Sequence, residues 1–332
     1  MKKNKTISIQ LFIYFLLYHS VFANVINISN ESEFLNILDS KDNQNEIHIN
    51  INSKISINKS FNITTSIKKI SIIGYSREMS IIEFPNLSDI LCFGKNVKEI
   101  ELKDISFKGN IFFDNNSRVT LDSISFIGNI NSNFDDNNND YIKIKNSIYK
   151  AFSYKTNYCI YLGGNIEINN SKFYGDSSCF KNLFYFNGSN IYNLKLTNSF
   201  FSGEYKCSCL YIENGNKIDI NSSLFSNGFV PKNLDEQGSG ITIFHSYTQI
   251  KNSTFKNFYS EWSGGSLYLD NTYDFIGEDL EIHNSTAYEM GSMAFVTSDI
   301  KGKLPVKFKN IRQYNTGNLT TKRLEHGGLI IW

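Results

Sequence analysis

Residues 252–271, with the sequence NSTFKNFYSEWSGGSLYLDN, contain the pattern from which the fold can be predicted. The stretch begins with a polar residue, Asn252, and has an aromatic residue three positions later, Phe255. A double glycine at 264–265 then precedes a four-residue apolar segment, which a turn closes at Asp270 and Asn271. Because versions of this unit recur along most of the chain, we expect a repeat protein.

Each unit contains a five-residue segment in which aliphatic and polar residues alternate and whose last residue is polar. The alternation has a period of two, which predicts β-strands. Spacings of about 19 to 32 residues lie in the range of solenoid repeats. The aligned segments are Ile100–Asp104, Val119–Ser123, Ile142–Asn146, Ile166–Asn170, Leu194–Asn198, Ile218–Ser222, Thr248–Asn252, Leu280–Asn284 and Val306–Asn310. Three residues after most of them stands an aromatic residue: Phe107, Phe126, Tyr149, Phe173, Phe201, Phe225 or Phe255.

The polar residue that ends each segment falls on the same strand face as the aliphatic residues, which must point into a core. We therefore expect this polar residue to point inward at a bend. One buried amide is costly unless it is paired, but a column with one amide per coil can form hydrogen bonds along the stack. The predicted polar ladder consists of Asp104, Ser123, Asn146, Asn170, Asn198, Ser222, Asn252, Asn284 and Asn310.

A four-residue apolar strand precedes each of these segments. Its copies are Ile90–Phe93, Cys159–Leu162, Leu183–Phe186, Cys209–Ile212, Ile241–Phe244, Ser266–Leu269, Met293–Val296 and Leu329–Trp332. We place the second and fourth positions inward, so the third position faces solvent as a stripe of Tyr161, Tyr185, Tyr211, Ile243, Tyr268 and Phe295. Exposed rings can stack on sugar faces or pack against a protein partner. In the alternative the third position also points inward, with the tyrosine hydroxyls paired in the core, since all four positions are apolar.

The N-terminus resembles a secretory signal peptide over residues 1–23. Three lysines in the first five residues precede a mostly apolar run at 7–18, and residues 21–23 offer a cleavage site after Ala23. We therefore expect a secreted or cell-surface protein, in which the membrane is contacted only through the signal peptide. An uncleaved anchor is the alternative. Abundant Asn-x-Ser/Thr sequons predict a glycoprotein if the host is eukaryotic.

Residues 24–332 are predicted to form one β-helix domain, with a cap and the first coils at 24–90 and the repeat coils at 91–332. Asn30 and Glu33 fit the capping-box pattern of a short helix, whose apolar face is made by residues 34–38. This amphipathic helix is expected to cap the N-terminal end. The sequence shows no C-terminal cap.

The five cysteines allow disulfides in a secreted chain, although the odd number leaves at least one without a partner in the same chain. Cys179 and Cys207 each follow their aromatic residue by six positions. We therefore expect these two to stack in neighbouring coils and to form a disulfide. Cys159 and Cys209 share a column but are two coils apart, about 9.6 Å, which is too far for a bond.

The net charge of +1 offers no electrostatic basis for nucleic-acid binding. Asp135, Asp136 and Asp140 lie in a polar insertion and are candidates for a calcium site, although they lack the ordered spacing of a known calcium loop. No other cofactor or metal is predicted. The histidines show no spacing typical of ligands or of catalysis.

The repeats resemble those of right-handed parallel β-helices of the pectin-lyase-like superfamily. They are also similar to the paired GG-x-I and F-x-x-N motifs of polymorphic outer-membrane and adhesin-like proteins. The matching segments are Phe107–Asn110, Phe126–Asn129, Gly264–Leu267 and Gly327–Ile330, and the resemblance covers residues 25–332. It implies an all-β, right-handed parallel β-helix of about ten coils, a fold that hosts lyases, hydrolases, esterases and adhesins.

The motifs of polygalacturonase-like members are not found in the chain, and no catalytic residue is predicted. Glu213 and Asp270 follow apolar strands, but in coils separated by others, so they do not form a visible carboxylate cluster. The leading hypothesis is therefore a non-catalytic, adhesin-like protein that binds polysaccharide or a surface protein through a coil face. The alternatives are a divergent polysaccharide lyase or glycoside hydrolase, and a structural spacer of a larger surface protein.

Overall fold

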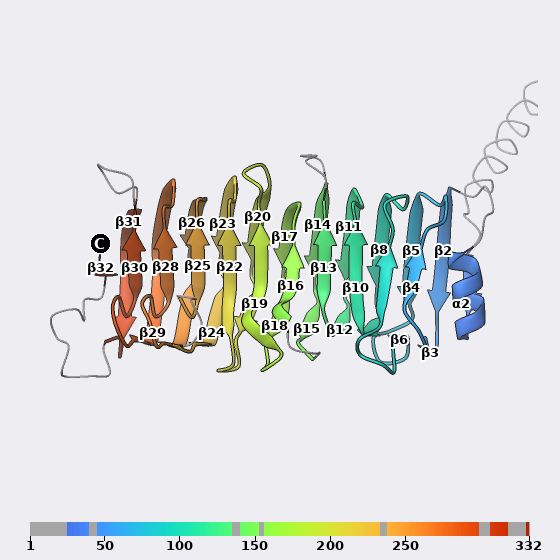
Figure 1. Ribbon diagram of the computed structural model, residues 1–332, viewed down its shortest axis with the longest axis horizontal. Helices are drawn as coiled ribbons and strands as arrows, with labels where there is room; N and C mark the ends of the chain where they lie inside the picture. The colour runs from blue at the N-terminus through green and yellow to red at the C-terminus, as the bar shows by residue number, and fades with distance from the viewer. Residues whose placement is uncertain are drawn as a thin grey trace, which may run out of the picture.

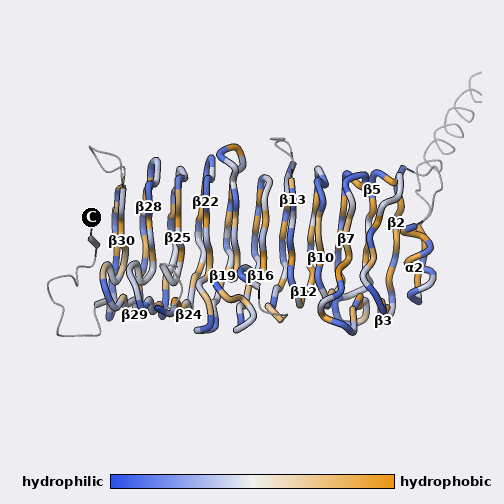
Figure 2. The backbone as a smooth tube through the Cα atoms, viewed as in Figure 1, coloured by the Kyte–Doolittle hydropathy of each residue, from blue (hydrophilic) through white to orange (hydrophobic). Residues whose placement is uncertain are grey.

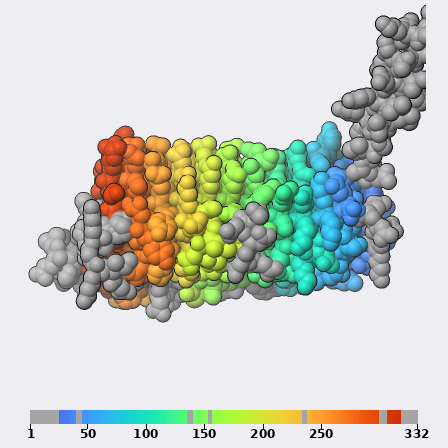
Figure 3. All heavy atoms as spheres, turned by 90° about the horizontal axis from the view of Figure 1, so that it is seen from above, coloured from blue at the N-terminus to red at the C-terminus, as the bar shows by residue number. Residues whose placement is uncertain are grey.

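The chain forms an all-β parallel β-solenoid of about 10 turns, with 60% of residues in strands and 3% in helix. The computed structural model describes residues 25–39, 45–134, 140–152, 156–232, 238–298, 306–317 and 330–331. Successive coils lie side by side along one axis (Figure 1) and form parallel ridges on the surface (Figure 3). The predicted fold class is therefore confirmed, whereas the predicted signal peptide lies outside the described residues.

Two strands of each coil belong to a 21-stranded sheet. The first series consists of β1 (Val25–Ile28), β2 (Glu46–Ile51), β5 (Lys69–Gly74), β8 (Glu99–Lys103), β11 (Arg118–Asp122), β14 (Tyr141–Lys145), β17 (Asn165–Asn169), β20 (Asn193–Thr197), β23 (Lys217–Asn221), β26 (Tyr247–Lys251), β29 (Asp274–Ala287) and β31 (Val306–Tyr314). The second series consists of β3 (Lys54–Ser56), β6 (Ile81–Glu83), β9 (Ser106–Lys108), β12 (Ser125–Ile127), β15 (Ile148–Lys150), β18 (Lys172–Tyr174), β21 (Phe200–Ser202), β24 (Leu224–Val230) and β27 (Thr254–Ser260), which β29 and β31 continue.

The third strand of each coil belongs to an 11-stranded sheet. Its members are β4 (Phe61–Ile63), β7 (Ile90–Phe93), β10 (Asn110–Asp114), β13 (Ile130–Asn133), β16 (Thr156–Leu162), β19 (Cys179–Asn187), β22 (Ser208–Glu213), β25 (Ile241–Phe244), β28 (Leu267–Asp270), β30 (Ala294–Thr297) and β32 (Ile330–Ile331). The sequence pattern missed β10, whose apolar run Ile111–Phe113 is only three residues long, and β13, in which only Ile130 is apolar.

The core lies between the sheets, and alternate residues of each strand point into it. This alternation is visible as orange and blue segments along the strands (Figure 2). The predicted aromatic residues stack in one buried column, with ring centroids 5.1 Å apart between Phe107 and Phe126 and 5.3 Å apart between Phe201 and Phe225. The five-residue pattern therefore placed its aliphatic and aromatic residues correctly.

The predicted polar ladder does not point inward. Its members have backbone φ angles of +48° to +55°, in the left-handed region, and most of their side chains are exposed. Asn and Asp tolerate this conformation better than most other residues with a Cβ, which explains seven of the nine members; Ser123 and Ser222 adopt it as well. The left-handed residue turns its own side chain outward, so the inward position passes to the next residue. The prediction of a buried column was therefore wrong for these residues.

The exposed amides still form hydrogen bonds between coils. Asn170 Nδ2 donates to Asn146 Oδ1 at 2.8 Å, and Asn252 Nδ2 donates to Asn221 Oδ1 at 3.0 Å. These bonds are solvent-accessible, so each contributes little net free energy of folding. The predicted bonding along the stack thus exists in part, but on the surface.

The buried polar column is one residue further along, and the sequence pattern missed it. We call it the serine ladder: Ser147, Ser171, Ser199, Ser223 and Ser253, all buried. The Ser199 hydroxyl accepts a hydrogen bond from the Ser171 N–H at 3.3 Å and donates one to the Thr197 carbonyl at 2.8 Å. The other members repeat this arrangement, so each hydroxyl satisfies a backbone N–H of the preceding coil.

The last predicted repeats contain one register error. Asp279, rather than Asn284, continues the column of Asn252, because Lys251 pairs with Glu278 in the sheet. Asn284 belongs to a second left-handed column and donates to Asn257 Oδ1 at 2.8 Å. The error arose because Gly277 occupies an aliphatic position, opposite Ile250, and hides the true segment.

The left-handed bend gives a testable expectation at Asn198. Its φ is +51° and its side chain is exposed. Replacing it with alanine is expected to lower the free energy of unfolding by about 1 kcal/mol, because a Cβ without a local hydrogen-bonding group is disfavoured there. Asn198→Gly is expected to match or exceed the native stability. Urea unfolding measures both, with Lys195→Ala in the adjacent strand as the control; equal effects of alanine at the two positions would contradict the assignment.

Helix α2 (Glu31–Leu38), which follows β1 in the chain, lies at the N-terminal end of the stack beyond β2 (Figure 1). The capping-box prediction is borne out locally: the Asn30 side chain accepts from the Glu33 N–H at 3.0 Å, and Glu33 accepts from the Ser29 N–H at 2.9 Å. Phe34 and Leu38 are fully buried. The apolar face of the helix thus rests on the first coils.

The predicted Cys179–Cys207 disulfide is wrong. Cys179 bonds to Cys159 instead, with the Cα atoms 5.1 Å apart, and the thiols of Cys207, Cys209 and Cys92 are free. Although Cys179 and Cys207 each follow their aromatic residue by six positions in the sequence, this equal spacing does not bring their side chains together. Cys207 lies beside Gly175, where a Cβ added to the glycine would come within 2.6 Å of the Cys207 sulfur.

Candidate functional site

The five predicted aromatic residues lie on the outer side of the 11-stranded sheet. Tyr161 pairs in register with Tyr185, and Tyr185 with Tyr211. The residues on either side of Tyr161, Ile160 and Leu162, are fully buried in the core. The third position of these strands therefore faces away from the core, as expected, although Tyr185 and Tyr268 are only 7% and 6% exposed.

The stripe is continuous because a residue outside the predicted column fills a gap in it. Thr242, not Ile243, lies in register between Tyr211 and Tyr268, and Ile243 points into the core. Phe244 bridges the gap, with its ring centroid 5.3 Å from that of Tyr211 and 6.1 Å from that of Tyr268. We call the set the outer aromatic ladder: Tyr161, Tyr185, Tyr211, Phe244, Tyr268 and Phe295.

The rings of the ladder stack on one another. Centroids are 5.0 Å apart with planes at 7° for Tyr161 and Tyr185, and 5.1 Å apart with planes at 18° for Tyr185 and Tyr211. The faces of these rings are therefore covered by neighbouring rings. The expectation that a sugar ring could stack flat on a ladder tyrosine is wrong for the interior members, because the strand spacing brings successive rings into contact. Only ring edges and hydroxyl groups remain for a ligand.

Carboxylates flank the ladder in the next outward position. Glu213 accepts a short hydrogen bond from the Tyr185 hydroxyl. Burial, followed by the effect of Glu213, raises the pKa of that hydroxyl well above its usual range. Burial and then Asp270 raise the pKa of Tyr268 to about 12. Both hydroxyls thus remain protonated donors at physiological pH. Glu213 and Asp270 share one column, with Phe244 between them, and so do not converge.

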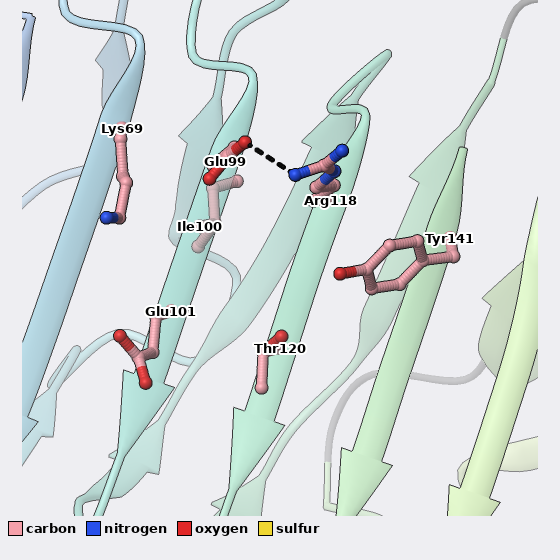
Figure 4. Close-up of a pocket in the computed structure, with 7 residues that line it drawn as sticks. All are labelled: Lys69, Glu99, Ile100, Glu101, Arg118, Thr120 and Tyr141. Carbon is pink, nitrogen blue, oxygen red and sulfur yellow. Dashed lines mark hydrogen bonds and ion pairs between the residues drawn. The ribbon is translucent and has the colours of Figure 1, made fainter. Parts of the chain in front are cut away.

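A polar pocket of about 240 Å³ lies on the other sheet, across β5, β8, β11 and β14 (Figure 4). Arg118 forms an ion pair with Glu99, with 3.1 Å between the guanidinium nitrogen and the carboxylate oxygen. Tyr141 lies on β14, the next strand after the one that carries Arg118 and Thr120 (Figure 4). Glu101 accepts from the Ser71 hydroxyl at 2.8 Å. The lining residues are Lys69, Glu99, Ile100, Glu101, Arg118, Thr120 and Tyr141. Ile100 is a buried residue of the repeat pattern; the other six occupy outward strand positions, which that pattern did not single out as a site.

The calcium prediction stays a prediction. Asp135 and Asp136 lie outside the described residues, and Asp140 is buried, with its backbone carbonyl accepting from the Asn165 N–H at 3.0 Å. Elsewhere in the described ranges, Cys159, Asp176 and Cys179 bring potential ligand atoms within 4.8 Å of one another. The disulfide occupies both of those sulfurs, whereas a metal binds cysteine as a thiolate.

The two surfaces offer different chemistry. The outer aromatic ladder presents a long row of ring edges with four phenol hydroxyls, flanked by two carboxylates that stand two coils apart. The polar pocket presents two carboxylates, two cations and a phenol in a small recess.

No helix among the described residues is long and apolar enough to span a membrane. Comparison of the chain with protein-family models, with curated proteins and with solved structures found no match in any of the three.

Proposed function

We propose that the protein is a secreted or cell-surface, non-catalytic binding protein, adhesin-like in character, whose ligand is an extracellular polysaccharide. The binding surface is the outer aromatic ladder. The proposal also takes the solenoid to be a right-handed β-helix of the pectin-lyase-like kind, on the sequence resemblance described above. The observation that carries it is the row of Tyr161, Tyr185 and Tyr211 in register on a face turned away from the core.

The chemistry of this row suits a long, hydroxyl-rich ligand. Phenol hydroxyls donate hydrogen bonds, and carboxylates such as Glu213 and Asp270 accept them, so both partners of a sugar hydroxyl are present. The hydroxyls of Tyr161, Tyr185 and Tyr211 repeat at the strand spacing of about 4.8 Å, and Tyr268 follows two coils further on, so an extended polymer can make several contacts along the row. Weak contacts repeated along one polymer raise the overall affinity above that of any single site.

The test removes hydroxyls while keeping the rings. The double variant Tyr161→Phe/Tyr211→Phe preserves the stacking and should therefore fold. Binding to an immobilised polysaccharide identified on a glycan array is expected to weaken about tenfold, corresponding to about 1.4 kcal/mol. Tyr247→Phe, on an exposed tyrosine of the other sheet, is the control and should bind normally.

Three results would count against polysaccharide binding along the ladder. The first is an empty glycan array together with capture of a surface protein, which would favour a protein partner. The second is unchanged binding in the double variant. The third is an absence of any ligand, which would leave the spacer alternative.

The polar pocket supports a second candidate, a divergent polysaccharide lyase or glycoside hydrolase. Glu99 and Glu101 alternate on β8 and so face the same side, next to Arg118 and Lys69 (Figure 4). Paired carboxylates of this kind can act as acid and base on a glycosidic bond. Turnover of pectin or another polysaccharide, with or without calcium, that is lost in Glu99→Gln and in Glu101→Gln would establish this function. Such turnover would overturn the binding-only proposal.

A further inference from the structure

A second recess lies at a corner of the solenoid, away from both surfaces described above. Its volume is about 390 Å³, near the lower end of the range for ligand pockets. Ile127 of β12 lies between Lys108 of β9 and Lys150 of β15 in the sheet register. Leu87, Ala151 and Phe152 complete its lining.

The walls of this recess are mostly apolar and partly open to solvent. Phe152 is 52% exposed, and Leu87 and Ile127 are half-buried. Apolar side chains in a recess are in unfavourable contact with water. A hydrocarbon part of a ligand that covers them removes this contact and so contributes favourable free energy of binding. The recess therefore favours a ligand with an apolar part.

The charge of the recess is positive. The described residues that line it include two lysines and no acidic residue. Glu83 comes within 3.9 Å of the Lys108 ammonium, but the Lys54 ammonium lies much closer to it, at 2.5 Å. Since the lysines stand two coils apart, about 9.6 Å between backbones, their flexible side chains can reach one anionic group from both sides.

We propose that this recess binds an amphipathic anion, namely a free straight-chain carboxylate of the fatty-acid class. The carboxylate lies between Lys108 and Lys150, and the alkyl chain covers Ile127 and Phe152. A free monomer is favoured over a membrane surface because the apolar walls span only the three coils of β9, β12 and β15, which is a small area for lipid insertion. The site is separate from the proposed polysaccharide surface, so each proposal stands without the other.

The test compares decanoate with decyltrimethylammonium by titration calorimetry on the full chain. The two probes carry chains of the same length and opposite charge. We expect decanoate to bind, the cation to bind at least tenfold more weakly, and added salt to weaken decanoate binding, since exposed charges are screened. Vesicles of phosphatidylcholine and phosphatidylglycerol should not sediment with the protein.

Matched variants locate the site. Lys108→Gln/Lys150→Gln is expected to weaken decanoate binding about tenfold and Phe152→Ala about fivefold, since both changes are at the surface and leave the core intact. Lys172→Gln, on the neighbouring strand β18 outside the recess, should leave it unchanged. Absence of decanoate binding, equal binding of both probes, unchanged binding in the lysine variant, or vesicle binding that depends on Phe152 would each overturn the proposal.

Discussion

Replacing Phe201 with alanine is expected to lower the free energy of unfolding by about 3–5 kcal/mol. Phe201 is fully buried in the middle of the internal aromatic column. Its ring stacks on Phe173 at 4.6 Å and on Phe225 at 5.3 Å, and it meets the edge of Phe184 at 6.1 Å. The substitution opens a cavity and breaks all three contacts, and the column cannot close the gap because each coil is held by its sheets.

Equilibrium unfolding in guanidinium chloride measures this loss. The control is Phe180→Ala, which removes a ring that is 43% exposed and should cost less than about 1 kcal/mol. A solenoid can unfold in parts, so the m-value must be compared as well as the midpoint. A loss at Phe201 no larger than the loss at Phe180 would show that the aromatic column does not carry the core.

The internal column was predictable from the sequence because its chemistry leaves one solution. Aliphatic residues at every second position must share a face, and an aromatic residue three positions after the bend must re-enter the core. Phe255, for example, was placed correctly from spacing alone and is fully buried. Repetition of this unit at spacings of about 19 to 32 residues then favoured a solenoid.

Whether the side chain of the bend residue points inward or outward was not predictable from the two-residue period of the strands. A strand pattern assumes extended backbone up to its last residue, whereas Asn198 adopts a left-handed conformation that reverses the alternation. The serine that follows it, Ser199, takes the inward place. The signal was present in the sequence, since serine follows the polar residue in five consecutive units, from Ser147 to Ser253.

The prediction for Ile241–Phe244 was wrong in register by one residue. It aligned the segment by its four-residue length, although the alternation of Ile241, Thr242 and Ile243 already favours Thr242 as the outward residue. Sheet pairing with Tyr211 and Tyr268 places Thr242 in the outer column.

The candidate binding face was therefore found with the correct orientation but the wrong mode of contact. A column of tyrosines at one per coil must stack, because about 4.8 Å between strands is close to the contact distance of aromatic rings. Tyr185 shows the consequence, since it has rings on both sides and is only 7% exposed. Ligands that use hydroxyls and ring edges are consistent with this geometry, whereas flat stacking is not.

The second large effect is expected on removal of the Cys159–Cys179 disulfide. The bond closes a loop with a sequence separation of 20 residues and joins the neighbouring strands β16 and β19. Restricting the unfolded chain over a loop of this size corresponds to about 3 kcal/mol in the chain-entropy model. We therefore expect Cys159→Ala/Cys179→Ala to lose about 3 kcal/mol of unfolding free energy. Unfolding and refolding in the presence of a reductant should have the same effect, because both cysteines are fully buried and the bond becomes accessible once the chain unfolds.

Counting the free thiols tests the cysteine pairing without any measurement of stability. The denatured, unreduced protein should react with a thiol reagent at Cys92, Cys207 and Cys209, and the reduced protein at all five cysteines. Peptide mapping should find one cross-linked pair, and a Cys179–Cys207 pair would contradict the observed connectivity. Cys92→Ser is the matched control, because it replaces a half-buried free thiol and keeps the disulfide; it should respond to reductant as the native chain does, whereas the double alanine variant should not respond. If the double alanine variant unfolds at the same denaturant concentration as this control, the disulfide does not constrain the unfolded chain in the way that its loop length requires.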